Sequence, residues 1–315
     1  MLSAQPDLDG SRPISRSKML IAKWFRSDTA LAYLLILPAA AFYAVFQLVP
    51  MVVAFGLSFF DWNGLSLSQA TFVGLDNYRE LMTDPQFRGA IEHNIVVMIA
   101  VVIFQCGGSF LLAVLIQAGV KGGRFLKIVF FAPVVMSSVA LGMLSIFIFS
   151  PGQGLLNTFL RELGLERFTQ PWLGSPTWAL PAVTVTAIVA QFGLSVLLFS
   201  SALASVDNEM LEAAEVDGAS QAVIIWRIVL PNVSNAASVV LLLGITSAFR
   251  LFDFVFIMTS GGPFHSSDTI VTYLYSVAFQ GNRVGYGNAV GVVLFVILLV
   301  ISIIQLRLTR RGNEV

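Results

Sequence analysis

Residues 30–60, ALAYLLILPAAAFYAVFQLVPMVVAFGLSFF, contain no charged side chain. About 20 apolar residues in a helix cross a hydrocarbon core of about 30 Å, so this stretch is long enough to span a membrane. Because a segment in lipid must satisfy its own backbone hydrogen bonds, the stretch is predicted to be helical. This run alone favours an integral membrane protein.

Five further apolar runs follow, at residues 94–117, 128–149, 178–204, 235–258 and 286–306. They lack the ten-residue alternation of apolar and polar side chains that is typical of outer-membrane barrels. Composition agrees, because 57% of the 315 residues are hydrophobic and 11% are charged, whereas soluble domains carry about 25% charged residues. The sequence therefore predicts an all-α integral membrane protein with six transmembrane helices.

Lysine and arginine are distributed unevenly between the two sides that six crossings create. The tails, the connection at residues 121–127 and the loop at residues 205–234 carry 12 of the 18 basic residues, and the other side carries 6. The positive-inside rule places both termini and this loop in the cytoplasm. We therefore expect a cytoplasmic N-terminal arm at residues 1–28, a transmembrane domain at 29–306 and a cytoplasmic tail at 307–315. The first apolar run is too long for the core of a cleaved signal peptide.

Several classes of function are disfavoured by the sequence. The single cysteine, Cys106, cannot form a disulfide framework, and with His93 and His265 it is too few for a metal site. No G-x-x-x-x-G-K-[ST] phosphate loop and no Ser/His/Asp set is evident. The net charge of zero offers no basic surface to nucleic acid. We therefore expect no catalytic residue, metal, nucleic-acid partner or cofactor on this chain, and no enzyme activity.

Two outward segments carry helix-start signals. Asp84 precedes a proline at what would be the first helical position, and it is suited to cap that helix. Residues 155–163, LLNTFLREL, place apolar side chains on one helical face and end at Gly164. This second helix is expected either to lie at the lipid headgroups or to receive a partner.

The loop SVDNEMLEAAEVDGASQAVIIWRIVLPNVS at residues 205–234 is unusual for a cytoplasmic loop, because it holds five acidic residues and one arginine. Asp207 is suited to cap a helix that continues through good helix formers. Gly218 can adopt the left-handed conformation that ends a helix. A second helix at residues 220–230 is expected to stop before Pro231. The loop is therefore predicted to form a helix, a glycine elbow and a second helix on the inner face of the membrane.

Seven positions in this loop match the spacing E-A-A-x3-G-x9-I-x-L-P, and they are Glu212, Ala213, Ala214, Gly218, Ile228, Leu230 and Pro231. The loop therefore resembles the EAA loop of ABC importer permeases. The resemblance implies a type I importer fold with a coupling helix that docks into a groove of a separate ATPase subunit. It also implies that ATP and magnesium are bound by the partner ATPase subunits. The acidic helix would offer carboxylates to basic groups there.

Three further segments are similar to carbohydrate-uptake permeases of this superfamily, near the maltose-type and glycerol-phosphate-type subunits. They lie at residues 72–78, 149–157 and 252–263, so the similarity covers roughly residues 30–306. The resemblance implies a bacterial inner-membrane importer for a sugar, an oligosaccharide or a polyol, including a glycerol-phosphate-like one. The implied partners are a second permease in a heterodimer, two ATPase subunits and an extracytoplasmic solute-binding protein.

The same resemblance places the solute contacts on the fourth and fifth helices. The candidate substrate-path residues are Gln191, Leu194, Gly244, Ala248 and Leu251. The competing interpretation is that the small residues among them serve ordinary helix packing.

Arg250 and Asp253 are the ionisable residues closest to membrane depth, where such groups are costly and commonly functional. At positions i and i+3 of a helix they form a candidate intramembrane ion pair. Its role would be either a structural pair at the outer boundary or solute binding.

The competing function is an ion-coupled secondary transporter. Such a protein is expected to show inverted repeats and carboxylates near the membrane midplane. The sequence shows neither, which favours the importer.

Overall fold

The computed structural model of the chain describes residues 28–312. Of the predicted N-terminal arm at residues 1–28, only Asp28 belongs to the described residues, and the predicted C-terminal tail is described as far as Gly312. The chain divides between Gly56 and Leu57 into two compact units, each of which is described by itself.

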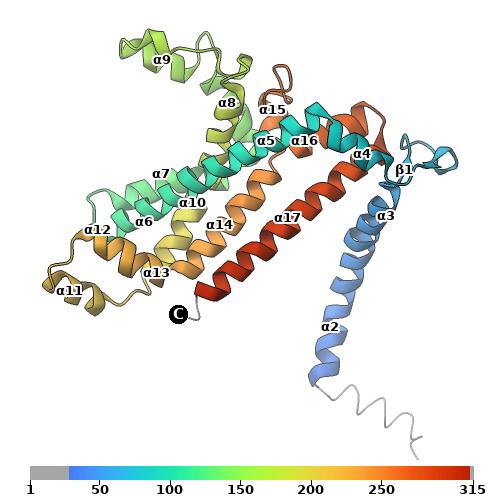
Figure 1. Cartoon of the computed structure of the whole chain (residues 1–315). Coiled ribbons are helices and arrows are strands. Elements are labelled where there is room, and N and C mark those ends of the chain that lie inside the picture. The colour runs from blue at the N-terminus through green and yellow to red at the C-terminus, as the bar shows by residue number, and fades with distance from the viewer. Residues whose placement is uncertain (1–27, 313–315) are drawn as a thin grey trace, which may run out of the picture. The chain divides into compact units, whose positions relative to one another are not determined.

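The first unit is a long apolar helix (Figure 1). α2 (Asp28–Tyr43) continues through a π-helical turn at Ala44–Leu48 into α3 (Val49–Leu57). Residues Ala32–Leu57 are long and apolar enough to cross a membrane, and their most apolar window has no buried residue. The helix predicted at residues 30–60 is thus confirmed, and a helix that is apolar on all sides requires lipid or protein around it.

The second unit is helical apart from a small hairpin, in which β1 (Phe60–Asp61) pairs antiparallel with β2 (Thr71–Phe72). Its α-helices are α4 (Asp76–Thr83), α5 (Pro85–Ala100), α6 (Gly108–Gln117), α7 (Gly123–Val135), α8 (Ser138–Ile148), α9 (Leu155–Glu162), α10 (Ala179–Leu203), α11 (Asn208–Val216), α12 (Gln221–Ile224), α13 (Leu230–Asn232), α14 (Ser234–Phe249), α15 (Asp253–Met258), α16 (Ile270–Tyr275) and α17 (Val284–Gly312). Three π-helical turns extend them, at Val101–Gly107, Ile225–Val229 and Ser276–Gln280. Short 3-10 turns occupy Leu67–Gln69, Glu166–Phe168 and Trp172–Gly174.

Six membrane crossings can be assembled from the described helices. Four are continuous, and they are Ala32–Leu57, Pro85–Gln117, Ala179–Leu203 and Val284–Arg307. Two are bent pairs of helices, α7 with α8 at 111°, and Gln221–Asn232 with α14 at 77°. Counting each bent pair as one crossing gives up to 6, in agreement with the predicted number.

The third predicted helix, residues 128–149, is not continuous. α7 contains Pro133 in its last turn and ends at Val135. The Ser137 hydroxyl then accepts a hydrogen bond from the Ala140 N–H and starts α8. Proline interferes with the helical hydrogen-bond ladder and serine is a favoured N-cap, so the two residues stop and restart the helix within one apolar run.

The fifth predicted helix, residues 235–258, is interrupted as well. α14 ends at Phe249 and α15 begins at Asp253, although residues 250–252 contain neither glycine nor proline. The structure also contains an apolar helix that was not predicted, Ile270–Gln280, which is shorter than a membrane crossing.

The two ends of the second unit differ in content (Figure 1). α11, α12 and α13 lie at one end, together with the connection between α6 and α7 and the C-terminal end of α17. α4, α9 and α16 lie at the other, which we call the outer end. The predicted topology, with the loop at residues 205–234 and the C-terminus on one side, agrees with this arrangement.

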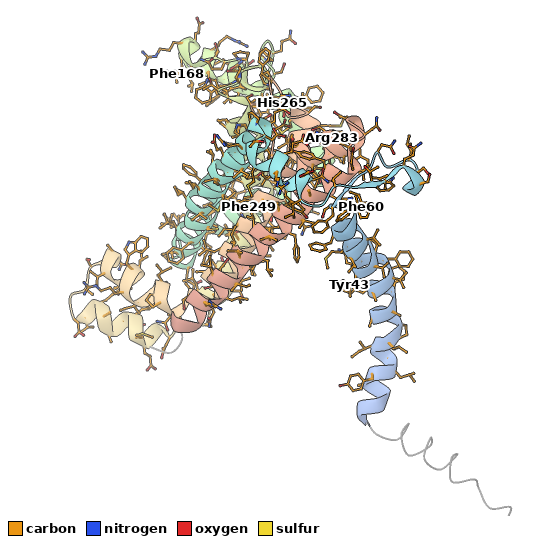
Figure 2. The ribbon with its side chains drawn as sticks, turned by 45° about the vertical axis from the view of Figure 1, so that its right-hand side comes forward. Tyr43, Phe60, Phe168, Phe249, His265 and Arg283 are labelled. Atoms are coloured by element: carbon orange, nitrogen blue, oxygen red, sulfur yellow. The ribbon has the colours of Figure 1, made fainter. Side chains whose placement is uncertain are left out.

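α10 connects the two ends through two apolar clusters. Val183 on α10 belongs to a cluster with Val97 and Val255, and Val196 belongs to a cluster with Val240. Phe249 is buried among the helices, whereas Phe168, His265 and Arg283 lie at the outer end (Figure 2).

Candidate functional site

The loop at residues 205–234 forms an exposed helical elbow. The Asp207 carboxylate accepts a hydrogen bond of 2.9 Å from the Glu209 N–H and caps α11. α11 ends at Val216 and is followed, after Asp217, by Gly218, whose φ of +80° is the left-handed conformation expected there. The Gly218 N–H bonds the Glu215 carbonyl and the Ala219 N–H bonds the Ala214 carbonyl. The predicted helix, glycine elbow and second helix are therefore confirmed.

The second helix of the elbow extends further than predicted. It runs through Gln221–Asn232 and so passes Pro231 instead of stopping before it. The π-helical turn at Ile225–Val229 precedes the proline, which lies in the first turn of α13. Proline lacks the N–H and crowds the preceding turn of a continuing helix, and the widened π turn directly before Pro231 accommodates it. The chain bends only after Asn232, before α14.

The seven motif residues divide into an exposed set and a packed set. Glu212, Ala213, Gly218 and Pro231 are exposed, and Ala214, Ile228 and Leu230 are half-buried. Ala214 and Leu230 pack against the cluster that holds Ile224, Val229 and Val233. The packed residues therefore hold the elbow against the bundle, while the exposed residues form an outward surface.

The surface of the elbow is acidic and partly apolar. Within the described part of the chain, its carboxylates form no ion pair, and Glu215 accepts a hydrogen bond of 2.8 Å from the Gln221 amide. Val216 and Trp226 are 88% and 60% exposed. Such a surface can offer carboxylates to basic groups and apolar side chains to a groove.

A cavity of about 1020 Å³ opens between the broken helices α7–α8 and α14–α15 and the middle of α10. Its lining combines polar groups with apolar ones, and includes Ser138, Gln191, Leu194, Thr246, Ser247, Arg250, Leu251, Phe252 and Asp253. The breaks in both broken helices lie at this cavity, so a polar solute in the cavity could contact the irregular backbone there. Non-helical backbone at membrane depth is expected at such cavities.

The structure brings only part of the predicted substrate path to this cavity. Gln191, Leu194 and Leu251 line it. Gly244 lies against the second crossing, where an added Cβ would stand 2.9 Å from Val101 Cγ1. Ala248 is 2% exposed and belongs to the core. Gly244 therefore fits the packing interpretation, whereas Ala248 also borders a small cavity of about 30 Å³ together with Gln191 and Leu251.

Arg250 and Asp253 line the cavity, but the predicted ion pair between them is not among the ion pairs of the described residues. The reason is that α14 ends at Phe249, so the helical i, i+3 spacing is lost. The Asp253 carboxylate instead accepts a hydrogen bond of 2.6 Å from the Ser138 hydroxyl. Sequence reasoning did not select Ser138, which reaches the cavity only because α7 and α8 are bent.

At the outer end, the predicted cap at Asp84 is confirmed and is part of a larger site. Asp84 Oδ1 accepts from the N–H groups of Gln86 and Phe87 at 2.8 and 3.3 Å. Asp84 Oδ2 accepts from the hydroxyls of Tyr286, at 2.8 Å, and Tyr273. Burial raises the pKa of Asp84, but these hydrogen bonds outweigh it and hold the pKa below its ordinary value.

The amphipathic helix predicted at residues 155–163 is present as α9. It spans Leu155–Glu162 and is followed by Gly164 at a φ of +70°. Leu155, Phe159 and Leu163 are 56% exposed or more, whereas Leu156 packs against the core, so only part of its apolar face is covered within the described chain.

Comparison with known proteins gives consistent matches. Residues 107–313 match the family described as "Binding-protein-dependent transport system inner membrane component". The probable ABC transporter permease protein YurN of Bacillus subtilis is 32% identical over 284 residues, which cover 90% of this chain and 97% of that protein. The multiple sugar-binding transport system permease protein MsmF of Streptococcus mutans is 30% identical over 267 residues, 85% of this chain and 91% of that protein.

A similar fold is found in a solved structure. A chain of a bacterial ABC transporter involved in the import of the acidic polysaccharide alginate superposes with a TM-score of 0.77 at 25% identity, covering 94% of this chain and 98% of that one. A bacterial alginate ABC transporter solved in complex with an alginate pentasaccharide-bound periplasmic protein is also similar, with a TM-score of 0.77 at 25% identity.

Proposed function

We propose that this chain, which belongs to the family of binding-protein-dependent transport system inner membrane components, forms the translocation path for a sugar, an oligosaccharide or a polyol. Family membership makes it a multi-pass inner-membrane permease subunit of an ABC importer and not an enzyme. It works with a substrate-binding protein and an ATPase.

The carbohydrate class is supported by the relatives and by the cavity. MsmF belongs to a sugar transport system, and the similar solved transporter imports alginate. A sugar requires hydrogen-bonding groups beside apolar faces, and the cavity offers Gln191 and Ser247 beside Leu194 and Phe252. Gln191, Leu194 and Leu251 are our proposed solute contacts, while Gly244 and Ala248 set how closely the helices pack.

The proposal includes further partners, and the exposed surfaces support it. The elbow, through Glu212, Ala213 and Gly218, docks on the ATPase, and two ATPase subunits bind ATP and magnesium. A second permease covers the open side of the cavity in a heterodimer. Both termini and the elbow lie in the cytoplasm, as the distribution of basic residues predicts. The shared end of α11–α13 and the C-terminal end of α17 supports this for the elbow and the C-terminus (Figure 1).

The observation that carries this proposal is the exposed, correctly spaced elbow on the fold of an importer permease. The test is co-purification in mild detergent followed by reconstitution with the co-purifying subunits and binding protein. We expect an ATPase with a phosphate-binding loop to co-purify, and carbohydrate uptake to require ATP. Uptake by the chain alone, driven by an ion gradient, would instead establish the secondary transporter.

A further inference from the structure

The break between α14 and α15 leaves backbone carbonyl groups that no helical N–H can satisfy. In a continuous helix, each carbonyl accepts from the N–H four residues further on, and a helix end removes those donors. The carbonyls of Ala248 and Leu251 lie at this break, and both residues are buried. Donors from other elements are therefore required to keep the break in one conformation.

Asn94 on α5 supplies one of these donors. Its side chain is 0% exposed, and its Nδ2 donates to the Ala248 carbonyl at 2.7 Å. Its Oδ1 accepts from the Ile270 N–H at 2.8 Å. One amide group therefore joins the end of α14 to the start of α16.

Thr269 supplies the second donor. Its side chain is 0% exposed, and its hydroxyl donates to the Leu251 carbonyl at 2.6 Å. Its own N–H donates to the Thr272 hydroxyl at 2.8 Å, which fixes Thr269 as the cap of α16. We call Asn94 and Thr269 the clamp, because together they hold both sides of the break.

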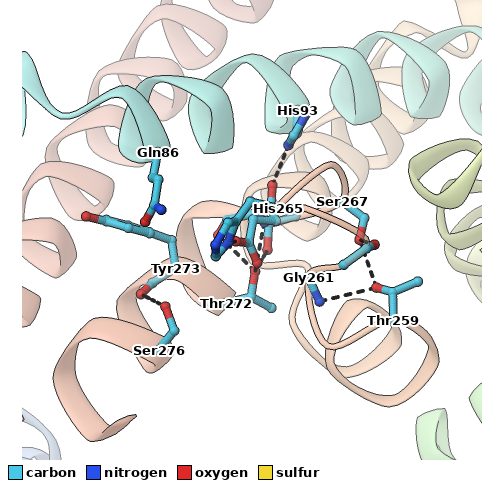
Figure 3. A network of polar contacts seen from close by, with 12 residues as sticks. Gln86, His93, Thr259, Gly261, His265, Ser267, Thr272, Tyr273 and Ser276 are labelled. Carbon is cyan, nitrogen blue, oxygen red and sulfur yellow. Dashed lines mark hydrogen bonds and ion pairs between the residues drawn. The ribbon is translucent and has the colours of Figure 1, made fainter. Parts of the chain in front are cut away.

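The clamp is continuous with the loop at residues 259–269, which is itself held by a polar network. The Thr259 and Ser267 hydroxyls are 2.9 Å apart, and the Gly261 N–H donates to the Thr259 hydroxyl (Figure 3). His93 on α5 bonds the carbonyl of Asp268 at 2.8 Å (Figure 3). These contacts tie the loop to itself and to α5, and Thr269 is the last residue of the loop.

The carboxylate of Asp268 occupies the centre of that loop. Asp268 Oδ2 is 2.6 Å from His265 Nδ1, and Oδ1 accepts from the Thr272 hydroxyl at 3.2 Å. A Cβ added to Gly261 would stand 1.9 Å from Oδ1, so the carboxylate packs directly on the glycine backbone. The tip of the loop, in contrast, presents Phe264, which is 91% exposed.

We infer that Asn94 and Thr269 are positioning residues of the solute path, which tie the outer loop at residues 259–269 to the helix break at the cavity. Residues 250–253 carry Arg250, Leu251 and Asp253 into the lining of the cavity. A displacement of the loop is thereby transmitted through two side chains to the groups that face the solute. This inference rests on the proposed function, because it assigns the clamp a role in the same solute path.

The test compares clamp variants in the complete importer, reconstituted with its ATPase, partner permease and binding protein. Asn94→Ala and Thr269→Val should each reduce solute uptake per ATP hydrolysed by about tenfold, since each removes a buried hydrogen bond. Thr269→Ser keeps the hydroxyl and should keep most of the coupling. Uptake and ATP hydrolysis are both normalised to the amount of assembled complex, so that a lower yield of folded protein is not mistaken for a loss of coupling.

The matched control is Asn157→Ala. Asn157 is 2% exposed and donates to the carbonyls of Pro151 and Gln170, but it does not line the cavity. Its replacement should lower the amount of folded complex and leave uptake per ATP unchanged. If Asn94→Ala and Thr269→Val behave in the same way as this control, the clamp is not a positioning device.

Amide hydrogen exchange in detergent provides a readout that requires no solute. Exchange at Ile270 and at residues 250–253 should accelerate in Asn94→Ala and stay unchanged in Asn157→Ala. Unchanged exchange in Asn94→Ala would overturn the clamp even if carbohydrate uptake is normal. Accelerated exchange in an importer that takes up no carbohydrate would support the clamp and overturn the proposed function.

Discussion

The elbow and the outer end of this permease use carboxylates in opposite ways. At the elbow, the carboxylates form no ion pair within the described chain, and the motif residues Glu212 and Ala213 are exposed. At the outer end, Asp84 accepts four hydrogen bonds and Asp268 is 6% exposed. Both regions are acidic, but Asp84 and Asp268 at the outer end are partly or fully withdrawn from solvent and held by several hydrogen bonds, whereas the acids of the elbow are exposed.

The exposed acids of the elbow form a surface that is available to a partner protein. Asp84 and Asp268 at the outer end instead hold the surrounding helices and loop in place. An exposed, solvated carboxylate contributes little to folding and remains available for an interface. A carboxylate held by several donors stabilises the elements that provide them. Substitutions at the exposed acids of the elbow should therefore change coupling without changing stability, whereas substitution of Asp84 should mainly change stability.

The largest expected effect is at the glycine of the elbow. Gly218→Pro should reduce uptake and coupled ATPase activity on the order of 100-fold, because proline is confined to negative φ and cannot adopt the left-handed conformation. Membrane insertion, measured by protease protection of the assembled chain, should be unchanged.

Gly164→Pro is the matched control for this variant. Gly164 also has a left-handed φ, +70°, and open space around its Cα, but it follows α9 at the outer end. Any strain from this proline falls at the outer end, far from the elbow, so coupling should stay within about twofold of wild type. Normal coupling in Gly218→Pro would remove the elbow from the mechanism.

The second-largest expected effect is a loss of stability at the outer end. Asp84→Asn keeps a capping group but loses the charge that accepts from two tyrosine hydroxyls, and it should lower the free energy of unfolding by about 2 kcal/mol. Thermal unfolding in detergent measures this loss. Asp76→Asn, at an exposed pair with Arg79, should cost less than about 1 kcal/mol.

The same carboxylate gives a dependence on pH. Because the pKa of Asp84 is held below its ordinary value of 3.8, the folded chain binds this proton less readily than the unfolded chain. Its stabilising contribution is therefore complete above the ordinary pKa and is lost as the pH falls through the folded-state pKa.

Between about pH 5 and about pH 3, wild-type thermal stability should fall more steeply than that of Asp84→Asn. The difference between the two melting temperatures as a function of pH measures this contribution. Parallel curves would show that the carboxylate is equally easy to protonate in the folded and the unfolded chain.

The smallest expected effect is at a single exposed acid of the elbow. Glu212→Gln should lower coupled ATPase activity by about threefold, with a stronger effect at low salt, because it removes one charge from an interface. Glu166→Gln provides an exposed outer-end control, which should leave coupling unchanged. A loss of thermal stability in Glu212→Gln would contradict the division between the two ends.

Sequence patterns predicted the features that depend on local chemistry. Asp84 and Asp207 cap helices as expected, and Gly218 has the left-handed φ that the pattern required. The number of membrane crossings was predicted from the apolar runs that lie between charged segments. These predictions hold because capping, glycine conformation and apolar length are decided within a few residues.

Features that depend on distant contacts were not predicted. The break at residues 250–252 is stabilised by hydrogen bonds from Asn94 and Thr269. Asn94 is remote in sequence and Thr269 comes after α15, so no local sequence signal marks the break. The predicted pair of Arg250 and Asp253 was wrong for the same reason. Ser138 lies at the cavity because α7 and α8 are bent relative to each other. The uninterrupted apolar run at residues 128–149 gave no indication of this bend.

The π-helical turns have a consequence for comparing this chain with its relatives. A π turn holds one residue more than an α-helical turn while leaving the flanking helix faces in place. The turn at Val101–Gly107, within the second crossing, therefore records the equivalent of a one-residue insertion. A chain that lacked one residue there and formed a regular α-helix instead would keep its side chains on the same faces on both sides of the turn.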